Sequence, residues 1–237
     1  MLVATHFAIG SDGPAPLLGR FNTRDDHDYA GRYRRGHRRC QSLIAVALLR
    51  YLISSFCPQI DAKERVLRTK KGRPYLAGDG ADMRIDISLS HSRNRVAAAI
   101  STVGPVGIDI EYLKPRRDFH AMAQQVSDLT MRQAVLVDSA ESFYRLWTMG
   151  ESLLKATCSR DVGWLGPKVL PDLLGDRFCA IEHQGTSMSI GSRNIGSYML
   201  GLTVIPTQQA PRAARLDNWP DAQMDAYNIS VYPIVLW

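Results

Sequence analysis

The chain has 237 residues, of which 45% are hydrophobic and 22% are charged. This composition is ordinary for a soluble globular protein, and the length allows one large domain or two of about 100 residues each. No apolar run approaches the roughly 20 residues that span a bilayer, and the first residues lack a secretion signal. The four cysteines are scattered, without the close spacing of metal ligands. We therefore expect reduced thiols, a cytoplasmic location and no membrane partner.

Positive charge is concentrated in the first third of the chain. The formal net charge is +6, yet residues 1–75 alone hold 14 Lys or Arg against 6 Asp or Glu, so the remainder sums to −2. The basic residues gather in 32–39 and 65–73. Such clusters attract phosphates or an acidic macromolecule, while a merely solvated basic face is the plainer alternative.

The first hundred residues predict a strand, a long helix and a hairpin. Leu2–Ile9 has the pattern of a buried strand, and a helical pattern runs from about Asp28 to Phe56, where Pro58 follows. Ile85–Ser90 and Val96–Ile100 predict the two strands of a hairpin. We expect its turn to contain His91, either as a plain turn residue or as part of a site.

Arg73 lies between Gly72 and Pro74, which predicts a tight turn at the exposed edge of a sheet. There the arginine is either an anion-binding side chain or an ordinary solvated charge.

Two acidic residues alternate with isoleucines after Gly104 and Pro105. In an extended strand Asp109 and Glu111 project from one face, while Ile108 and Ile110 project from the other. Two close carboxylates favour a hard cation such as Mg²⁺, although most such pairs are simply solvated. If consecutive strands pair, His91 and Asp109 lie on the same sheet.

The second half predicts helices followed by strands. Short helical patterns cover about 118–126 and 130–137, and a longer one runs from about Ala140 to Thr157. In the long helix Glu151 and Lys155 are four residues apart and thus neighbours, either as part of a site or as a surface ion pair. We expect a second sheet from Phe178–Glu182, Ser187–Ile190, Tyr198–Val204 and Ile229–Leu236.

Four segments in this order resemble the 4′-phosphopantetheinyl transferases of the surfactin-synthetase type. They are Gly72-Arg73-Pro74, residues 87–92 (Ile-Ser-Leu-Ser-His-Ser), residues 106–111 (Val-Gly-Ile-Asp-Ile-Glu) and residues 147–155, and Glu151 follows Asp109 by 42 positions. The resemblance covers roughly residues 30–158. It implies an α+β fold of two similar α/β halves related by pseudo-twofold symmetry, with the active site in the cleft between them. We expect the halves to be residues 1–104 and 105–237.

The resemblance also implies a function. Members of the family transfer the phosphopantetheine arm of coenzyme A to a serine of an acyl or peptidyl carrier protein, with Mg²⁺ as cofactor, and release 3′,5′-ADP. They commonly act as monomers. We expect coenzyme A and a carrier protein as partners, and no nucleic acid.

The site residues are carried over position by position. The resemblance implies that Asp109, Glu111 and Glu151 hold Mg²⁺, with Asp109 also part of the coenzyme A site. It implies that coenzyme A contacts Arg73, Pro74, Ser90, His91 and Lys155, and the basic residues Arg32, Arg38 and Arg39 are candidates for its 3′-phosphate or for the acidic carrier. We expect Glu151, Lys155 and His91 to be catalytic, as a base, as a cation for the leaving group and as a hydrogen-bond donor to a phosphate.

Three departures from the family pattern leave alternatives open. Gly150 stands where the family normally has a lysine, Gln41 stands where it often has an arginine, and residues 156–161 replace the Gly-rich turn that usually follows the last lysine. A degenerate relative that binds coenzyme A or a carrier without turnover is the second hypothesis, and it rests on Gly150. The third hypothesis is a Mg²⁺-dependent nucleic-acid enzyme. It is motivated by the basic residues near the start of the chain and by the three carboxylates.

Overall fold

A computed structural model describes the protein. It covers residues 1–9, 15–78, 85–114, 140–158, 177–183, 185–207, 223–224 and 230–234. Within these residues helices and antiparallel sheets occur together, so the α+β class is confirmed. The chain forms two compact units, one of Met1–Gly104 with Pro220–Val235 and the other of Pro105–Trp219 with Leu236–Trp237.

The first unit contains a five-stranded antiparallel sheet with the order β10-β11-β1-β5-β4. Its strands are β1 (Leu2–Ala8), β4 (Asp86–Ser92), β5 (Arg95–Ser101), β10 (Gln223–Met224) and β11 (Ser230–Ile234). A separate two-stranded sheet joins β2 (Val66–Arg68) to β3 (Pro74–Leu76).

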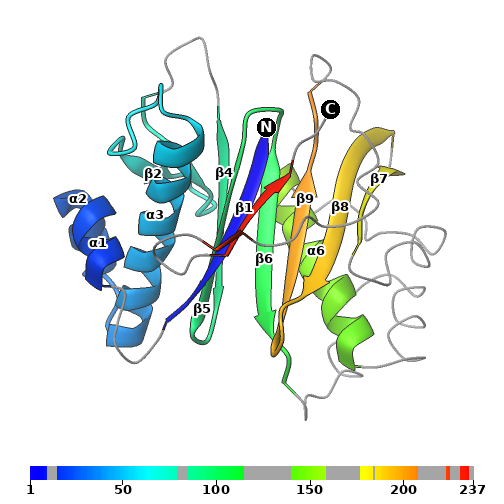
Figure 1. The fold of residues 1–237 in the computed structure, drawn as a ribbon, viewed down its shortest axis with the longest axis horizontal. Helices are drawn as coiled ribbons and strands as arrows, with labels where there is room; N and C mark the ends of the chain where they lie inside the picture. The colour runs from blue at the N-terminus through cyan, green and yellow to red at the C-terminus, as the bar shows by residue number, and fades with distance from the viewer. Residues whose placement is uncertain are drawn as a thin grey trace. The chain divides into compact units, whose positions relative to one another are not determined.

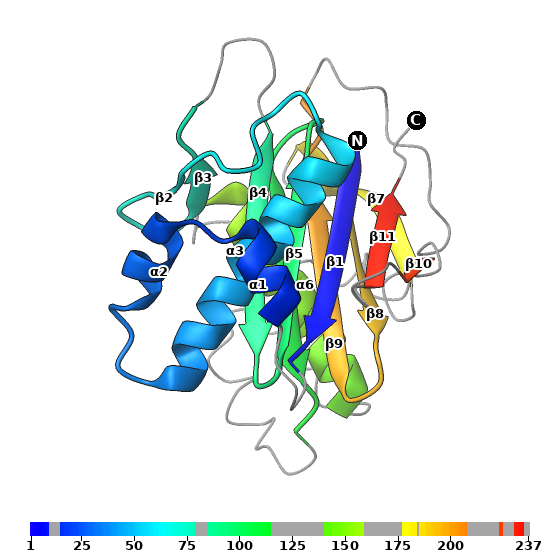
Figure 2. The same cartoon turned by 60° about the vertical axis from the view of Figure 1, so that its left-hand side comes forward.

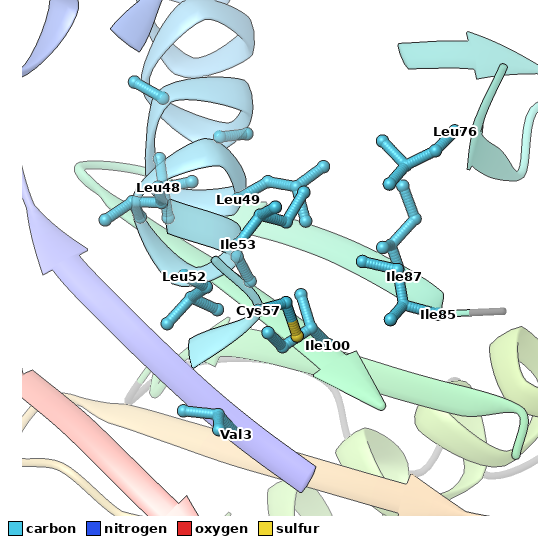
Figure 3. Packing of buried hydrophobic residues seen from close by; sticks show 14 of the residues in the cluster. Val3, Leu48, Leu49, Leu52, Ile53, Cys57, Leu76, Ile85, Ile87 and Ile100 are labelled. Carbon is cyan, nitrogen blue, oxygen red and sulfur yellow. The ribbon is translucent and has the colours of Figure 1, made fainter. Parts of the chain in front are cut away.

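One face of this sheet is covered by helix α3 (Gly36–Phe56), with the short helices α1 (Ala15–Phe21) and α2 (Arg24–Ala30) packed on α3 (Figures 1 and 2). Leu48, Leu49 and Leu52 of α3 contribute to the same buried cluster as Ile87 and Ile100 of the sheet (Figure 3). Burial of these apolar side chains is the main force holding α3 on the sheet.

The long helix expected from about Asp28 starts later than the sequence pattern suggests. α2 ends at Ala30, a turn through Gly31 follows, and α3 begins only at Gly36. The two glycines are poor helix formers, and the arginines between them have no apolar face to bury. Arg32 thus lies in the connection, while Arg38 and Arg39 lie in the first turns of α3.

The predicted hairpin is confirmed, but its turn is tighter than expected. Ser92 pairs with Arg95, so Arg93 and Asn94 form the turn and His91 is a strand residue opposite Val96. Arg93 has a φ of 49°. Left-handed backbone in a two-residue turn matches the twist of the flanking strands, which is why the strands extend to the turn.

The last strand lies in the first sheet and not in the second, where we expected it. β11 pairs with β1, and Pro233 is opposite Val3. β1 is paired with β5 on its other side, so β11 covers an edge that would otherwise expose unpaired backbone groups. The alternation of a strand shows which residues share a face, but it does not select the edge to which the strand adds.

The second unit has one four-stranded antiparallel sheet with the order β6-β9-β8-β7. It consists of β6 (Val106–Tyr112), β7 (Arg177–His183), β8 (Thr186–Asn194) and β9 (Tyr198–Val204), with helix α6 (Ala140–Thr157) packed on β6, β9 and β8 (Figure 1). The predicted bounds of the long helix are confirmed. The two short helices predicted within 118–137 lie outside the described residues.

Asp109 and His91 belong to different sheets, contrary to the expectation that three consecutive strands pair. β6 pairs with β9, whereas β5 pairs with β1 and β4. The reason is the break between β5 and β6, where Gly104 has a φ of 150° and the second unit starts at Pro105. None of the described helices combines enough length with enough apolar character to cross a bilayer.

Candidate functional site

Glycines allow α6 to lie unusually close to the sheet of the second unit. A Cβ on Gly107 of β6 would overlap the backbone oxygen of Ser152, and one on Gly201 of β9 would overlap the backbone of Thr148. No side chain fits at either position. The strand and helix that contain the candidate residues are therefore in backbone contact.

Buried hydroxyl groups fix the alignment of the helix on the sheet. Ser152 and Thr203 are both fully buried, and their side-chain oxygens are 2.7 Å apart. Thr203 lies opposite Gly107, and Gly201 lies opposite Asp109 in the antiparallel pairing of β6 with β9. A hydrogen bond requires close alignment of its two groups, so this contact favours the observed position of α6 along the strands.

The two carboxylates of β6 lie on the face that α6 covers. Gly107, Asp109 and Glu111 alternate along the strand with buried Ile108 and Ile110, and Gly107 faces α6 directly. Asp109 is 5% exposed. The alternation predicted from the sequence therefore places both carboxylates toward the helix that contains Glu151.

Lys155 binds Asp109. Its Nζ donates hydrogen bonds to Oδ1 of Asp109 at 2.7 Å and to the carbonyl oxygen of Ile108 at 2.9 Å. The ammonium group thus compensates a buried negative charge. The sequence pointed to Glu151 as the neighbour of Lys155 on the helix, but the carboxylate that Lys155 contacts is 46 positions away in the chain.

The chemistry of the carboxylates fits a hard divalent cation, because all three predicted ligands offer oxygen atoms. Asp109 and Glu111 lie on the face toward α6, and Glu151 lies one helical turn before Lys155. Within the described part of the chain, however, no three His, Cys, Asp or Glu side chains are gathered closely enough to hold an ion. The assignment of Asp109, Glu111 and Glu151 as metal ligands stays a prediction.

Several candidate residues of the first unit lie in β4 or next to it. Arg73 forms a salt bridge with Asp86 at the start of this strand, so the arginine expected to bind an anion already has a carboxylate partner. Pro74 is buried in β3, and Ser90 is 8% exposed on β4. Gly72 has a φ of 85°, which agrees with the tight turn predicted around Arg73.

His91 is bound by an arginine of α3. Nη1 of Arg38 lies 2.8 Å from Nδ1 of His91. Gln41, one turn further along α3, is buried and donates to the carbonyl oxygen of Arg93 in the hairpin turn. Sequence reasoning identified Arg38 and His91 separately, without any signal that they meet.

Aromatic rings accompany the basic residues near the start of α3. The guanidinium of Arg32 lies over the ring of Tyr29 at 5.2 Å, and that of Arg68 lies over the same ring at 5.1 Å. Burial raises the pKa of the Tyr29 phenol, and its contact with Tyr33 adds to the rise. Arg39 donates from Nε to the carbonyl oxygen of Tyr33. Stacking on tyrosine orients the guanidinium groups while leaving their charge intact.

Sequence reasoning missed several residues that organise these positions. They are Thr148, Ser152, Gly201 and Thr203 on the second unit, whereas Gln41 of the first unit was noted only as a departure from the family pattern. Gly201 and the hydroxyl residues carry no local signal, because each acts through a contact with a distant element. Gly150, the position where the family has a lysine, is buried within α6.

Comparison with known proteins agrees with the resemblance at the level of the superfamily. Residues 105–195 match the family model of the 4′-phosphopantetheinyl transferase superfamily. The chain is 33% identical over 93 residues to the 4′-phosphopantetheinyl transferase HetI of Nostoc sp. (strain PCC 7120), and the match covers 37% of this chain and 38% of the relative. It is 33% identical over 124 residues to AcpT of Escherichia coli K12, covering 51% of this chain and 58% of the relative.

A putative 4′-phosphopantetheinyl transferase of Haemophilus influenzae is 36% identical over 101 residues, covering 39% of this chain and 40% of the relative. The chain thus spans between about two fifths and three fifths of the length of these relatives. The matches support the 4′-phosphopantetheinyl transferase superfamily. The matched residues 105–195 include all of β6 and α6, on which the second-unit candidates lie.

Proposed function

We propose that the protein transfers the 4′-phosphopantetheine arm of coenzyme A to a serine of an acyl or peptidyl carrier protein and releases 3′,5′-ADP. We assign it to the surfactin-synthetase type of the superfamily, acting as a cytoplasmic monomer. The observation that carries the proposal is the arrangement of Asp109 and Glu111 on the face of β6 toward the helix that contains Glu151 and Lys155. The same segments are those that match the superfamily.

Each residue then has a chemical task. The serine hydroxyl of the carrier attacks the phosphorus that bears the pantetheine group, and the bond from this phosphorus to the leaving 3′,5′-ADP oxygen breaks. Glu151 accepts the serine proton, directly or through a water molecule. Lys155 neutralises negative charge that develops on the leaving oxygen, and His91 donates a hydrogen bond to a phosphate oxygen.

We further propose that Asp109, Glu111 and Glu151 hold a Mg²⁺ ion when coenzyme A binds. The ion would supply positive charge to the diphosphate oxygens. In the protein alone, Lys155 supplies the positive charge beside Asp109. Activity should disappear in the presence of a chelator and return when Mg²⁺ is added in excess.

The direct test measures the mass of a carrier protein after incubation with coenzyme A and Mg²⁺. Wild-type protein should add the phosphopantetheine arm, and Glu151→Gln should slow the transfer by about 10²–10⁴-fold, the usual contribution of a general base. Glu141→Gln is the matched control, because Glu141 lies on the same helix but pairs with Arg145. Equal rates for wild type and Glu151→Gln would remove Glu151 from the chemistry, and no transfer to any carrier would refute the function.

A second candidate is a relative that binds coenzyme A or carrier without turnover, and it rests on Gly150. A buried glycine provides no cation at a position where the family has lysine. Calorimetry that shows coenzyme A binding, combined with no transfer, would favour this candidate. Gain of transfer in Gly150→Lys would then show that the missing lysine is the cause.

A further inference from the structure

The contact between Arg38 and His91 determines which ring nitrogen carries a proton. A guanidinium group contains only hydrogen-bond donors, so at 2.8 Å the Nδ1 of His91 must be the acceptor. An accepting Nδ1 holds a lone pair. The ring is then neutral, and its proton is on Nε2.

Neighbouring residues hold Arg38 in position for this contact. Its Nη1 also donates to Oε1 of Gln41 at 3.3 Å, and its guanidinium lies over the ring of Tyr33 at 5.3 Å. Stacking and a second hydrogen bond restrict a long side chain that would otherwise sample many rotamers.

Gln41 in turn ties α3 to the hairpin that contains His91. Its Nε2 donates to the carbonyl oxygen of Arg93 at 2.6 Å, and Nε2 of His37 lies 2.8 Å from the same oxygen. Gln41 is 5% exposed, so its amide is fixed by these contacts. The helix that presents Arg38 and the strand that presents His91 are thereby held together through one backbone oxygen.

We propose that Arg38, held by Gln41, is a positioning residue that keeps His91 neutral with its proton on Nε2. If the proposed transfer function is correct, this assignment makes His91 a hydrogen-bond donor toward a phosphate oxygen. It also excludes Nδ1 of His91 as an acceptor of the serine proton, because that lone pair is occupied by Arg38. Gln41 then has a role of its own in the position where the family often has arginine.

Nuclear magnetic resonance of the free protein tests the proposal without coenzyme A or carrier. A long-range ¹H–¹⁵N correlation at a pH of about 8 distinguishes the two ring nitrogens of each histidine. Wild type should show the proton of His91 on Nε2 and an unprotonated Nδ1. Loss of the His91 signals in His91→Gln assigns them.

Variants of Arg38 separate its donor role from a purely structural one. Arg38→Lys keeps a donor and should retain the wild-type signature, whereas Arg38→Glu offers only an acceptor and should move protonation toward Nδ1. Arg38→Met and Gln41→Met should give mixtures of the two tautomers. Arg34→Met, which removes an exposed arginine from the same segment, should change nothing.

A second arginine–histidine pair serves as an internal control. Nη1 of Arg95 lies 3.0 Å from Nδ1 of His6 on β1, in the same unit. The signals of His6 should stay unchanged in every Arg38 variant that folds. A wild-type proton on Nδ1 of His91, or an unchanged His91 in both Arg38→Met and Arg38→Glu, would overturn the proposal.

The outcome is independent of whether the transfer function is correct. The expected signatures without any transfer activity would leave the positioning role standing and reject the function. If the protein is active, Arg38→Met should raise the KM for coenzyme A by at least about tenfold. Arg38→Lys should have a KM close to that of the wild type. An unchanged KM in Arg38→Met would overturn the link between the tautomer and coenzyme A binding.

Discussion

At the residue scale, Gly107 allows α6 to approach the sheet of the second unit closely. Gly107→Ala places a Cβ where the backbone oxygen of Ser152 now lies, so α6 must move away from β6. We expect a loss of about 1–3 kcal/mol in the free energy of unfolding, or more, measured by urea denaturation.

Gly19→Ala is the matched control for this substitution. Gly19 lies in α1, and a Cβ added there would have no atom within 4 Å, so alanine in this helix should stabilise by about 0.5–1 kcal/mol. Equal effects of the two substitutions would contradict the close approach of α6 to the sheet.

The ion pair between Lys155 and Asp109 should be measurable by a double-mutant cycle. Asp109 is buried, and removing the lysine leaves its carboxylate without the ammonium group 2.7 Å away. We expect Lys155→Met to lower the free energy of unfolding by about 1–3 kcal/mol. In an Asp109→Asn background the same substitution should cost much less, and equal costs would show that the two groups are not coupled.

Cys57 gives a prediction for the pH dependence of stability. Burial raises the pKa of its thiol above the ordinary value of 9.0. The unfolded chain therefore releases this proton at a lower pH than the folded protein does. The stability that the protonated thiol contributes is fully present below pH 9 and is lost as the pH rises from 9.0 toward the higher folded value.

Denaturant titrations at a series of pH values should show this loss of stability. In Cys57→Ser the free energy of unfolding should fall less steeply with pH above 9. Exposed Cys158 should react with an alkylating agent in the folded protein while Cys57 stays protected. Rapid alkylation of both residues would contradict the burial of Cys57.

At the scale of elements, a buried arginine of α3 connects this helix to α2 and to the segment that follows α3. Arg50 of α3 is 1% exposed and forms hydrogen bonds with both carboxylate oxygens of Asp26 in α2. It also donates to the carbonyl oxygens of Ala62 and Glu64 in the segment after α3. One guanidinium thus holds three parts of the first unit together.

Arg50→Met should destabilise the first unit by about 3–5 kcal/mol, because it leaves the carboxylate of Asp26 buried without its cation. The matched control is Arg24→Met, which breaks the pair between Arg24 and Asp28 within α2. The side chains of these two residues are 94% and 73% exposed. That substitution should change the free energy of unfolding by less than about 1 kcal/mol. Similar costs for the two variants, measured by thermal unfolding, would reject the connecting role of Arg50.

At the scale of the whole molecule, the first sheet depends on a strand from the far end of the chain. β11 pairs with β1, although nearly all of the second unit lies between these two strands in the sequence. Removing residues 223–237 should therefore loosen the first unit.

Hydrogen exchange followed by mass spectrometry measures this effect. In the shortened chain, the amides of β1 that face β11 should exchange at least about tenfold faster, because they lose their strand partner. The amides of β9, which lies between β6 and β8, are the control. Unchanged exchange in β1 would show that β11 contributes nothing to the first sheet.

Local patterns in the sequence were sufficient for some of the elements, although not for α1, α2 or the start of α3. The alternation of Asp109 and Glu111 with isoleucines predicted a strand and the face its carboxylates share. Apolar spacing predicted α6 with its observed bounds, and the β4–β5 hairpin was predicted apart from its turn. Each of these features depends on residues within a few positions of one another, so the sequence alone determines it.

Tertiary structure decided which elements meet. The pairing of β6 with β9, the addition of β11 to β1, the contact of Lys155 with Asp109 and that of Arg38 with His91 all join residues far apart in the chain. Periodicity states which side chains share a face but does not name the partner that will cover it. That choice follows from the packing of complete units. Gly107 allows the backbone of α6 to approach β6, and Gln41 accepts a hydrogen bond that helps to hold Arg38 in position.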